Sequence, residues 1–487
     1  MIDLGFREAS FGGVPETIVT REAWPDSRIL EVLRRERGIV GLGFGSQSPG
    51  QTTQLRNLGL ENLIVCQRKS YHKPGGDETN WEKALRYGWK PGVNLFSEIE
   101  EAMPRGTMHL YLISDGGQVT TWPTVKNYLK HRDALNFSHG FSYVFKDITG
   151  VIPPKYVDLG LVAPKATGSS VERGGMNASY EVPQDYTGRG IERILALGMG
   201  IGSGIMLQTT FPNETYSDLF GERFFLLGGV RAIAEVSDER ELRRGKNKFE
   251  AFINSSEQIT QVILPLIGEK GFDEIYARAQ AAGQLGTVRQ YETAVREAAQ
   301  PFMEELYNSV KSGNEARKAV AINTRPDYEN ELKSRLRQID SEEMWEAGKF
   351  IRNTVPDRTY GGTITNWQAV GMIIGTIKAQ YQFLIDHGHK TSEAINETVE
   401  EMVRSLNPFY SEKGIAYLLG KCSTTAQVGA DEWSPKFMEV LRQAVKELRD
   451  SYGNDVPLRI GQKLGTKPNM EQVYLDNMKY RPSTRAA

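Results

Sequence analysis

The chain has few of the residues that stabilise secreted proteins, with only two cysteines, Cys66 and Cys422, among 487 residues. Two cysteines do not form a disulfide framework, and their scarcity fits a reducing compartment. The longest apolar run, 194–207, has 14 residues interrupted by glycine and is too short to span a bilayer. Residues 1–5 resemble neither a transit peptide nor a secretory signal. We therefore expect a cytoplasmic protein, with a mature organelle-matrix form as the alternative.

Neither sign of charge is in excess, because 59 basic and 61 acidic side chains leave a formal net charge of −2. A nearly neutral chain has no electrostatic footprint for nucleic acid or for an anionic membrane, so we expect neither as a partner. The length is sufficient for two or three domains.

Two kinds of hydrophobic pattern divide the chain. Through residue 212, short apolar runs alternate with helical stretches, which is typical of a βαβ domain around a parallel sheet. From residue 213 onward helical periodicity predominates. We therefore predict an α/β domain over 1–212 and an all-α half, which a loop at 353–363 divides into 213–355 and 356–487 with a C-terminal tail. The expected strands are Gly38–Leu42, Leu63–Cys66, His109–Ile113, Ala134–Phe137 and Val157–Val162.

The all-α half contains an internal repeat. A shift of 143 residues places Pro265 on Pro408 and Glu269–Gly271 on Glu412–Gly414. Further upstream a shift of 147 residues fits better. The two registers set four carboxylates opposite uncharged residues: Glu397 opposite Asn254, Glu401 opposite Gln258, Asp218 opposite Thr365 and Glu222 opposite Ala369.

This division of carboxylates predicts one metal site in place of two. Carboxylates four residues apart on a helix share a face, so each copy offers one pair. Four such side chains suit hard divalent cations such as Mg²⁺, and their four charges balance two ions. The opposing set supplies no carboxylate. We infer an ancestral symmetric dimer, fused into one chain, with one of its two sites abandoned.

A glycine-rich turn follows the first expected strand. Residues 43–48 read Gly-Phe-Gly-Ser-Gln-Ser and precede a helical stretch. Small residues there let a pyrophosphate approach the backbone at a helix N-terminus, although Ser48 replaces the third glycine of the dinucleotide pattern. After the second strand, where an NAD site carries an acidic residue, the chain has Gln67-Arg68-Lys69-Ser70 and then Lys73. This cluster favours the 2′-phosphate of NADPH, and a solvated basic loop is the alternative.

Six motifs follow one another along the chain: Gly43–Gln47, Ser114–Gln118, Ser138–Phe141, Val162–Lys165, Ser217–Arg223 and Cys422–Gln427. Together they resemble ketol-acid reductoisomerase, also called acetohydroxy acid isomeroreductase. The duplicated helical half is similar to the long form of that family, whose helical domain is knotted. The resemblance therefore implies a Rossmann-like dinucleotide-binding domain followed by a duplicated, knotted helical domain.

The same resemblance implies an NADPH- and Mg²⁺-dependent enzyme of valine, leucine and isoleucine biosynthesis. Such an enzyme moves an alkyl group within 2-acetolactate or 2-aceto-2-hydroxybutyrate and then reduces the resulting 2-keto acid to a 2,3-dihydroxy acid. A migration that starts from a tertiary alkoxide needs strong Lewis acids, which agrees with two Mg²⁺ ions in one site. The family also implies a homo-oligomer, either a dimer or a tetramer.

The resemblance assigns the metal ligands. Asp218 would bridge the two Mg²⁺ ions and Glu222 would bind one of them. Glu397 and Glu401 would serve the second ion, directly or through water. Glu214, one turn before Asp218, matches a further acidic position of the family.

It also assigns the catalytic and cofactor residues. Ser423 would hydrogen-bond the substrate, while His139 and Lys165 would lie near the nicotinamide and the metal-bound water, and Glu401 is counted with them as catalytic. The residues expected to bind the cofactor are Gly43, Phe44, Gly45, Ser46, Gln47, Arg68, Ser70, Ser114, Asp115, Gln118 and His139.

Two segments depart from the family pattern. Residues 166–176, after Lys165, are shorter than usual and lack the usual pair of basic residues, and Phe224-Phe225 is bulkier than expected. The acidic helix expected over 392–406 would, taken alone, be a solvated face, and His387-Gly388-His389 before it a simple turn. The repeat register and the resemblance favour a metal-binding helix instead.

Two other functions remain open. One is an NADPH-dependent 2-keto or 2-hydroxy acid dehydrogenase without an isomerase step, which differs in not requiring two metal ions. The other is an inactive structural relative, against which the intact carboxylates, Lys165 and Ser423 argue.

Overall fold

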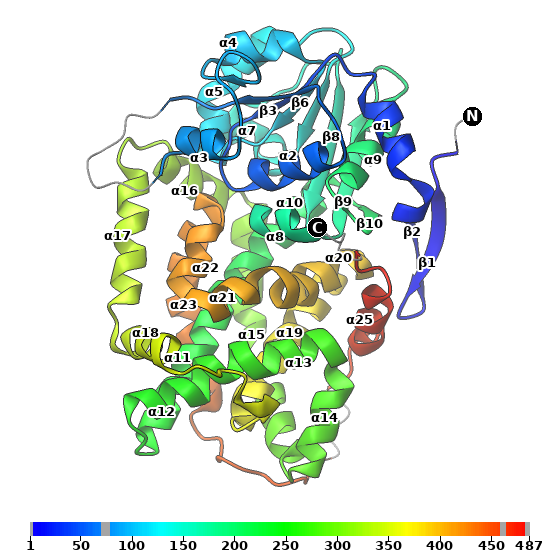
Figure 1. Cartoon of the computed structure of the whole chain (residues 1–487). Coiled ribbons are helices and arrows are strands. Elements are labelled where there is room, and N and C mark those ends of the chain that lie inside the picture. Colours follow the sequence, from blue (N-terminus) through cyan, green and yellow to red (C-terminus); the bar gives the residue numbers. More distant parts are fainter. Residues whose placement is uncertain (1–2, 70–77, 458–463, 483–487) are drawn as a thin grey trace.

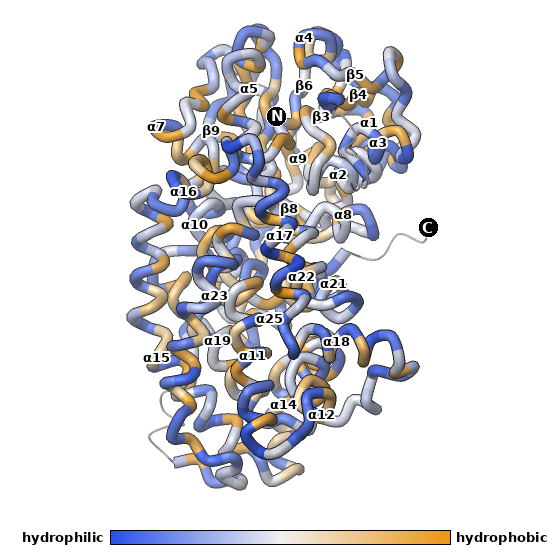
Figure 2. The backbone as a smooth tube through the Cα atoms, turned by 90° about the vertical axis from the view of Figure 1, so that its left-hand side faces the viewer, coloured by the Kyte–Doolittle hydropathy of each residue, from blue (hydrophilic) through white to orange (hydrophobic). Residues whose placement is uncertain are grey.

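The structure is a computed structural model and describes residues 3–69, 78–457 and 464–482. A sheet with flanking helices forms one end of the molecule, and a body of helices forms the other (Figure 1). Helices α8 (Gly168–Gly174), α10 (Phe211–Gly221) and α16 (Asn314–Asn323) lie at the level where the two halves meet, as Figure 2 also shows. No described helix is both long and apolar enough to cross a membrane.

One ten-stranded mixed sheet forms the centre of the first half, in the order β1-β2-β10-β9-β8-β7-β6-β3-β4-β5. Its strands are β1 Phe6–Phe11, β2 Val14–Thr20, β3 Ile39–Leu42, β4 Leu63–Cys66, β5 Leu95–Phe96, β6 Met108–Tyr111, β7 Ala134–Phe137, β8 Asp158–Pro164, β9 Ala178–Gln184 and β10 Ile205–Gln208. From β8 to β5 neighbouring strands run parallel, whereas β9 pairs antiparallel with β8, and β2 pairs antiparallel with both β10 and β1.

The five predicted strands form the parallel centre of this sheet, and each lies within two residues of its predicted bounds. They were predictable because every residue of β3, β6, β7 and β8 is buried, which gives continuous apolar runs. The antiparallel strands β1, β2, β9 and β10 were not predicted. The apolar run 194–207 is divided between helix α9 (Gly190–Gly200) and β10. Its glycines allow close packing, since a Cβ on Gly198 would lie 2.2 Å from Met206 Cε.

Short helices connect the strands and cover both faces of the sheet. They are α1 Asp26–Leu33, α2 Gln47–Asn57, α3 Asn80–Arg86, α4 Ile99–Ala102, α5 Asp115–Tyr128, α6 Phe141–Val144 and α7 Lys146–Thr149, with the 3₁₀ turns η1 Arg21–Ala23 and η2 Met103–Arg105. The shortened segment after Lys165 forms α8, which packs tightly on α2. A Cβ on Gly50 would lie 2.1 Å from the Gly168 carbonyl oxygen, so only glycine fits there.

The second half consists of helices. They are α10, α11 Gly228–Arg243, α12 Lys248–Phe252, α13 Leu264–Lys270, α14 Phe272–Ala281, α15 Leu285–Lys311, α16, α17 Tyr328–Asp340, α18 Glu343–Thr354, the 3₁₀ turn η5 Tyr360–Gly362, α19 Trp367–Asp386, α20 Thr391–Ile395, α21 Asn407–Lys413, α22 Ile415–Lys421, α23 Thr424–Val445 and α25 Met470–Met478. Four stretches have π-helical hydrogen bonding: η3 Glu222–Leu226, η4 Ile253–Ile263, η6 Asn396–Glu400 and η7 Met402–Leu406.

The two copies of the repeat have the same local structure. A shift of 143 residues superimposes α12 on α20, η4 on the span from η6 to η7, and α13 on α21. A glycine with positive φ ends both α13 and α21, Gly271 at 77° and Gly414 at 96°. Both copies therefore keep the same π-helical distortion and the same helix stop.

The copies also pack against each other in equivalent ways. Helix α15 of the first copy packs along α19 of the second, and α11 of the first packs along α23 of the second. Likewise α13 contacts η7 while α21 contacts η4. One large apolar core runs through both copies, and Phe224, whose bulk was unexpected, contributes to it by packing its ring 4.8 Å from that of Phe437. This reciprocal exchange is the packing expected of a fused dimer.

Candidate functional site

Charged side chains converge where the carboxyl ends of β7 and β8 face the helical half. His139 lies two residues after β7, and Lys165 follows β8 directly. Helix α10 carries Glu214 and Asp218, and the π-helix η6 of the second copy carries Glu397. Ligands of open α/β sheets bind outside the carboxyl ends of the strands, so the topology makes this the candidate site.

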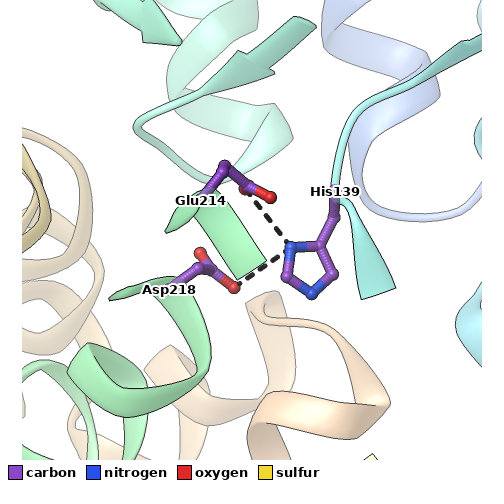
Figure 3. A group of neighbouring side chains, drawn as sticks. All are labelled: His139, Glu214 and Asp218. Carbon is purple, nitrogen blue, oxygen red and sulfur yellow. Dashed lines mark hydrogen bonds and ion pairs between the residues drawn. The ribbon is translucent and has the colours of Figure 1, made fainter. Parts of the chain in front are cut away.

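Figure 3 shows His139 with its ring directed at the two carboxylates of α10. Its Nδ1 lies 3.3 Å from Glu214 Oε1 and 3.4 Å from Asp218 Oδ2. Glu214 Oε2 also accepts the backbone N–H of Gly140 at 2.9 Å, which fixes the carboxylate. Burial alone would lower the pKa of His139, but Glu214 and Asp218 outweigh it and raise that pKa well above its ordinary value. Among the described residues the ring's Nε2 has no hydrogen-bond partner, which leaves it free for a ligand.

Lys165 lies deeper in the same site, with a side chain that is 2% exposed. Its Nζ donates to Glu397 Oε1 and lies 4.0 Å from Glu214 Oε1. Burial alone would lower the pKa of Lys165, but Glu397 and then Glu214 raise it above the ordinary value. The lysine is therefore a fixed positive charge at neutral pH.

Asp218, Glu222, Glu397 and Glu401 form an uncompensated group of carboxylates. Burial raises the pKa of Glu222, with Asp218 adding to it, and burial raises that of Glu401, with Glu397 adding to it. The pKa of Glu397 is raised to about 8 by burial, against the effect of Lys165 and with that of Asp218. Carboxylates that raise one another's pKa in this way require counter-charge.

The same group fits a pair of hard cations. The Oε2 atom of Glu397 is buried without a hydrogen-bond partner among the described residues. His139, Glu214 and Asp218 also bring three ligand atoms within 4.8 Å of one another. Carboxylate oxygens are the ligands that Mg²⁺ prefers. Glu222, Glu397 and Glu401 lie in or beside π-helical turns, which frequently mark functional sites.

Ser423 caps the N-terminus of α23 beside this group. Its Oγ accepts the N–H of Ala426 at 3.0 Å, so its own hydrogen remains free to donate to a ligand. Cys422 lies next to it; burial raises the pKa of its thiol, with Glu222 and Glu401 adding to the effect. Cys422 is therefore a partly buried neighbour of the carboxylates.

The abandoned site predicted from the repeat also comes together in the structure. The hydroxyl of Thr365 donates to Asn254 Oδ1 at 2.8 Å, and its backbone N–H donates to Gln258 Oε1 at 2.9 Å. Gln258 Nε2 donates to the carbonyl of Thr363 at 3.3 Å. Ala369 supplies no polar side chain. Neutral hydrogen bonds thus connect positions that carry carboxylates in the other site.

The glycine-rich turn has the shape of a phosphate cradle. Gly43 adopts φ of 93°, and a Cβ there would lie 3.0 Å from the backbone of Ile113, so the turn requires glycine. A Cβ on Gly45 would have nothing within 4 Å, which leaves room at the N-terminus of α2. Ser46 is the N-cap of α2, but its side chain makes no cap hydrogen bond, so that end of the helix can bind an anion.

Some residues of this turn have structural contacts. The backbone N–H of Phe44 donates to Gln67 Oε1 at 2.8 Å, which ties the turn to the end of β4. Gln47 Nε2 donates to the Ala166 carbonyl at 2.9 Å. Arg68 is exposed, as a residue that binds a 2′-phosphate must be. Ser70 and Lys73, predicted to share that role, lie outside the described residues.

The second predicted cofactor loop lies at the start of α5. Ser114 is its N-cap. Thr425 of α23 donates to Asp115 Oδ2 at 2.6 Å, so Asp115 joins the sheet half to the helical half. Gln118 is buried and donates to the carbonyls of Tyr111 and Ile113, at 3.2 and 2.9 Å. In the structure Gln118 thus supports the loop from within.

Several residues near the site were not singled out as functional from the sequence. Glu393, 1% exposed, accepts Thr209 Oγ1 at 2.9 Å and lies 3.6 Å from Nδ1 of His389, so this part of the acidic helix is not a solvated face. Buried Arg223 lies 3.8 Å from Glu222 and donates to Glu315 at 2.9 Å. The only signal for Arg223 was its place at the end of the motif Ser217–Arg223.

Both halves of the chain match models of one protein family. Residues 33–206 match "Acetohydroxy acid isomeroreductase, NADPH-binding domain". Residues 211–357 and 367–454 match "Ketol-acid reductoisomerase, C-terminal domain". The boundary between the two matches falls between β10 and α10.

Individual relatives agree with these matches. A ketol-acid reductoisomerase (NAD(+)) of Desulfosudis oleivorans is 41% identical over 353 residues, which are 72% of this chain and 97% of that protein. A chloroplastic ketol-acid reductoisomerase of Pisum sativum is 32% identical over 432 residues, 86% of this chain and 72% of that protein. A solved NADH-preferring ketol-acid reductoisomerase from an uncultured archean superimposes with a TM-score of 0.56 at 25% identity, covering 70% of this chain and 99% of that one.

Proposed function

The chain belongs to the ketol-acid reductoisomerase family, and on that basis we propose that it isomerises and reduces 2-aceto-2-hydroxy acids with NADPH and two Mg²⁺ ions. The family acts in branched-chain amino-acid biosynthesis, and its members are NAD(P)-dependent oxidoreductases. The observation that carries the proposal is the group of four carboxylates described above, which lies beside Lys165 and His139 and has no other source of balancing charge among the described residues.

Asp218, Glu222, Glu397 and Glu401 would hold the two ions, which when bound supply the Lewis acidity that alkyl migration needs. Because the pKa of Lys165 is raised, it keeps its proton and donates a hydrogen bond beside the substrate oxygens. Glu214 orients the ring of His139 through Nδ1, so that Nε2 faces the ligand.

The remaining polar groups would place the substrate and the cofactor. Ser423 donates its free hydrogen to the substrate. The N-terminus of α2 and the open face of Gly45 receive the pyrophosphate. We also propose a homo-oligomer, a dimer or a tetramer, located in the cytoplasm or, as the named mitochondrial and chloroplastic relatives favour, in an organelle matrix.

An NADPH-oxidation assay with 2-acetolactate, with and without Mg²⁺, tests the reaction. We expect oxidation only when Mg²⁺ is present, because migration must precede reduction and needs the metal ions. The control supplies the isomerised 2-keto acid directly. A dehydrogenase without an isomerase step would reduce that keto acid without Mg²⁺ and leave 2-acetolactate unchanged, and this result would overturn the proposal.

The preference for NADPH rests on the basic cluster after β4, since the named relatives include both NAD(+) and NADP(+) enzymes. We expect Arg68→Asp combined with Ser70→Asp to raise the KM for NADPH by roughly tenfold to hundredfold, because charge-assisted hydrogen bonds to the 2′-phosphate are lost. The KM for NADH should change little. Steady-state kinetics with both cofactors measure this, and an equal rise for the two would show that the cluster does not read the phosphate.

A further inference from the structure

The segment that follows the second copy of the repeat contacts the helix that carries Glu397 and Glu401. Arg481, which lies three residues beyond α25, donates from Nε to Glu400 Oε1 at 2.8 Å and from Nη2 to Glu400 Oε2 at 2.7 Å. Glu400 belongs to η6, and its side chain is 1% exposed. A buried carboxylate needs such a partner, and the paired geometry makes the contact strong and directional.

The first copy has an equivalent contact. Arg358, in the loop between α18 and α19, donates from Nε and Nη2 to the two oxygens of Glu257, at 2.9 and 3.0 Å. Glu257 is the counterpart of Glu400 at the shift of 143 residues, lies in η4, and is also 1% exposed. The two arginine side chains are similarly covered, at 17% exposed for Arg358 and 20% for Arg481.

Each arginine also reaches the opposite copy at an equivalent position. Arg481 donates from Nη1 to the carbonyl of Gly268 at 2.8 Å. Arg358 donates to the carbonyl of Ser411, which is the counterpart of Gly268. We refer to these two arrangements as the Arg481 clamp and the Arg358 clamp. Each joins the π-helix of its own copy to the following helix of the other.

The clamps are related in space but not in sequence register. Arg358 follows its glutamate by 101 residues, whereas Arg481 follows its glutamate by 81. No constant shift therefore aligns them. Both also lie outside the matches to the family models, which cover 211–357 and 367–454 in this half.

The Arg481 clamp differs from the other in what it supports. Glu400 lies between Glu397 and Glu401, whereas Glu257 lies between Asn254 and Gln258. The α25 segment adds a contact on the other side of Glu397, because Asn396 Nδ2 donates to Asn477 Oδ1 at 2.8 Å. Arg404 is a looser partner of Glu400, at 3.5 Å. The segment around α25 thus holds residues on both sides of Glu397 and the residue before Glu401.

We propose that Arg481 is a positioning residue that fixes the π-helical turns of Glu397 and Glu401, so that the α25 segment sets the affinity of the site for Mg²⁺. The proposal rests on the function proposed above for the carboxylates. Arg358 does the same for the site that lost its carboxylates, where no metal affinity depends on it. The repeat unit therefore extends past the residues that align, and each copy ends in its own clamp.

The test compares Arg481→Met with Arg358→Met in the full-length protein. Calorimetric titration with Mg²⁺ should show about tenfold weaker binding for Arg481→Met, as when an outer-shell partner of a metal ligand is lost, and unchanged binding for Arg358→Met. The thermal midpoint should fall by a similar amount in both variants, which separates positioning from general stability. Equal Mg²⁺ affinities in the wild type and Arg481→Met, or equal losses in the two variants, would overturn the proposal.

Hydrogen exchange tests the clamp without relying on metal. Amides of residues 396–406 should exchange faster in Arg481→Met, and those of 253–263 faster in Arg358→Met. A wild type that binds no Mg²⁺ would contradict the proposed function, whereas unchanged exchange over 396–406 would contradict the clamp. If Arg481→Met does not fold, Glu400→Gln with Glu257→Gln as its control removes the same ion pairs with a smaller change in shape.

Discussion

Asp218→Asn is expected to lower turnover of 2-acetolactate by about 10³-fold or more, the largest effect of any single change considered for this protein. Asp218 lies 3.4 Å from His139 and contributes to the raised pKa values of Glu222, Glu397 and Glu401, so it is electrically at the centre of the site. Asparagine keeps the shape but removes the charge, and one oxygen ligand becomes an amide nitrogen. Steady-state kinetics with NADPH and 2-acetolactate, together with Mg²⁺ titration, measure the loss.

The abandoned site supplies a control at the corresponding position. Thr365→Val removes the hydroxyl that donates to Asn254 Oδ1 at 2.8 Å and should cost about 1 kcal/mol of stability without changing turnover. Near-normal turnover in Asp218→Asn would remove the two-metal mechanism. A similar loss of turnover in both variants would mean that both sites serve the reaction.

Glu401→Gln is expected to lower kcat by about 10²-fold with little loss of stability, because it places in the live site the residue that the other copy already carries as Gln258. A neutral amide cannot balance a divalent cation, and it relieves the repulsion that raises the pKa of the carboxylates around it. Mg²⁺ titration of the wild type should saturate at about two ions per chain, and the variant should bind fewer.

The reverse substitution in the other copy completes this comparison. Gln258→Glu should neither rescue Glu401→Gln nor create a second site, since Thr365 and Ala369 supply no carboxylate. It should also be mildly destabilising, because Gln258 Nε2 now donates to the Thr363 carbonyl, and a carboxylate cannot. Four tightly bound ions per chain, or full activity in Glu401→Gln, would contradict the inference of one site per chain.

Much of the candidate site could be predicted because its signals are local or repeated. Gly43 is required by a backbone of positive φ packed against Ile113, and that requirement appears in the sequence as a glycine after a buried strand. The repeat register predicted that Thr365 faces Asn254 and Gln258, and the hydrogen bonds confirm it. Roles for Ser423 and His139 came only from motifs, and they remain predictions.

The antiparallel strands were missed for a different reason. β1, β2, β9 and β10 alternate in burial or are short, and their partners lie far away in the sequence. β10, for example, pairs with β2, so Ile205 faces Thr20 across the sheet. An isolated run of four residues carries no sign of such a partner, because the hydrogen bonds that define the strand come from the rest of the fold.

The sequence by itself determined the parallel core strands, the nucleotide turn, the duplication and the loss of carboxylates from one copy, because each depends on hydrophobic period, on backbone strain or on a constant register. Only the tertiary structure decided which charges meet. The approach of Lys165 to Glu397 joins residues 232 apart, and the contact of Arg481 with Glu400 joins residues 81 apart. The π-helical turns of η4, η6 and η7 were also invisible in the sequence, since the side-chain pattern of an amphipathic helix does not distinguish i→i+5 from i→i+4 bonding over one or two turns. Burial of a charge is stabilising only when a partner arrives with it, and the chain path that brings the partner has no local signature.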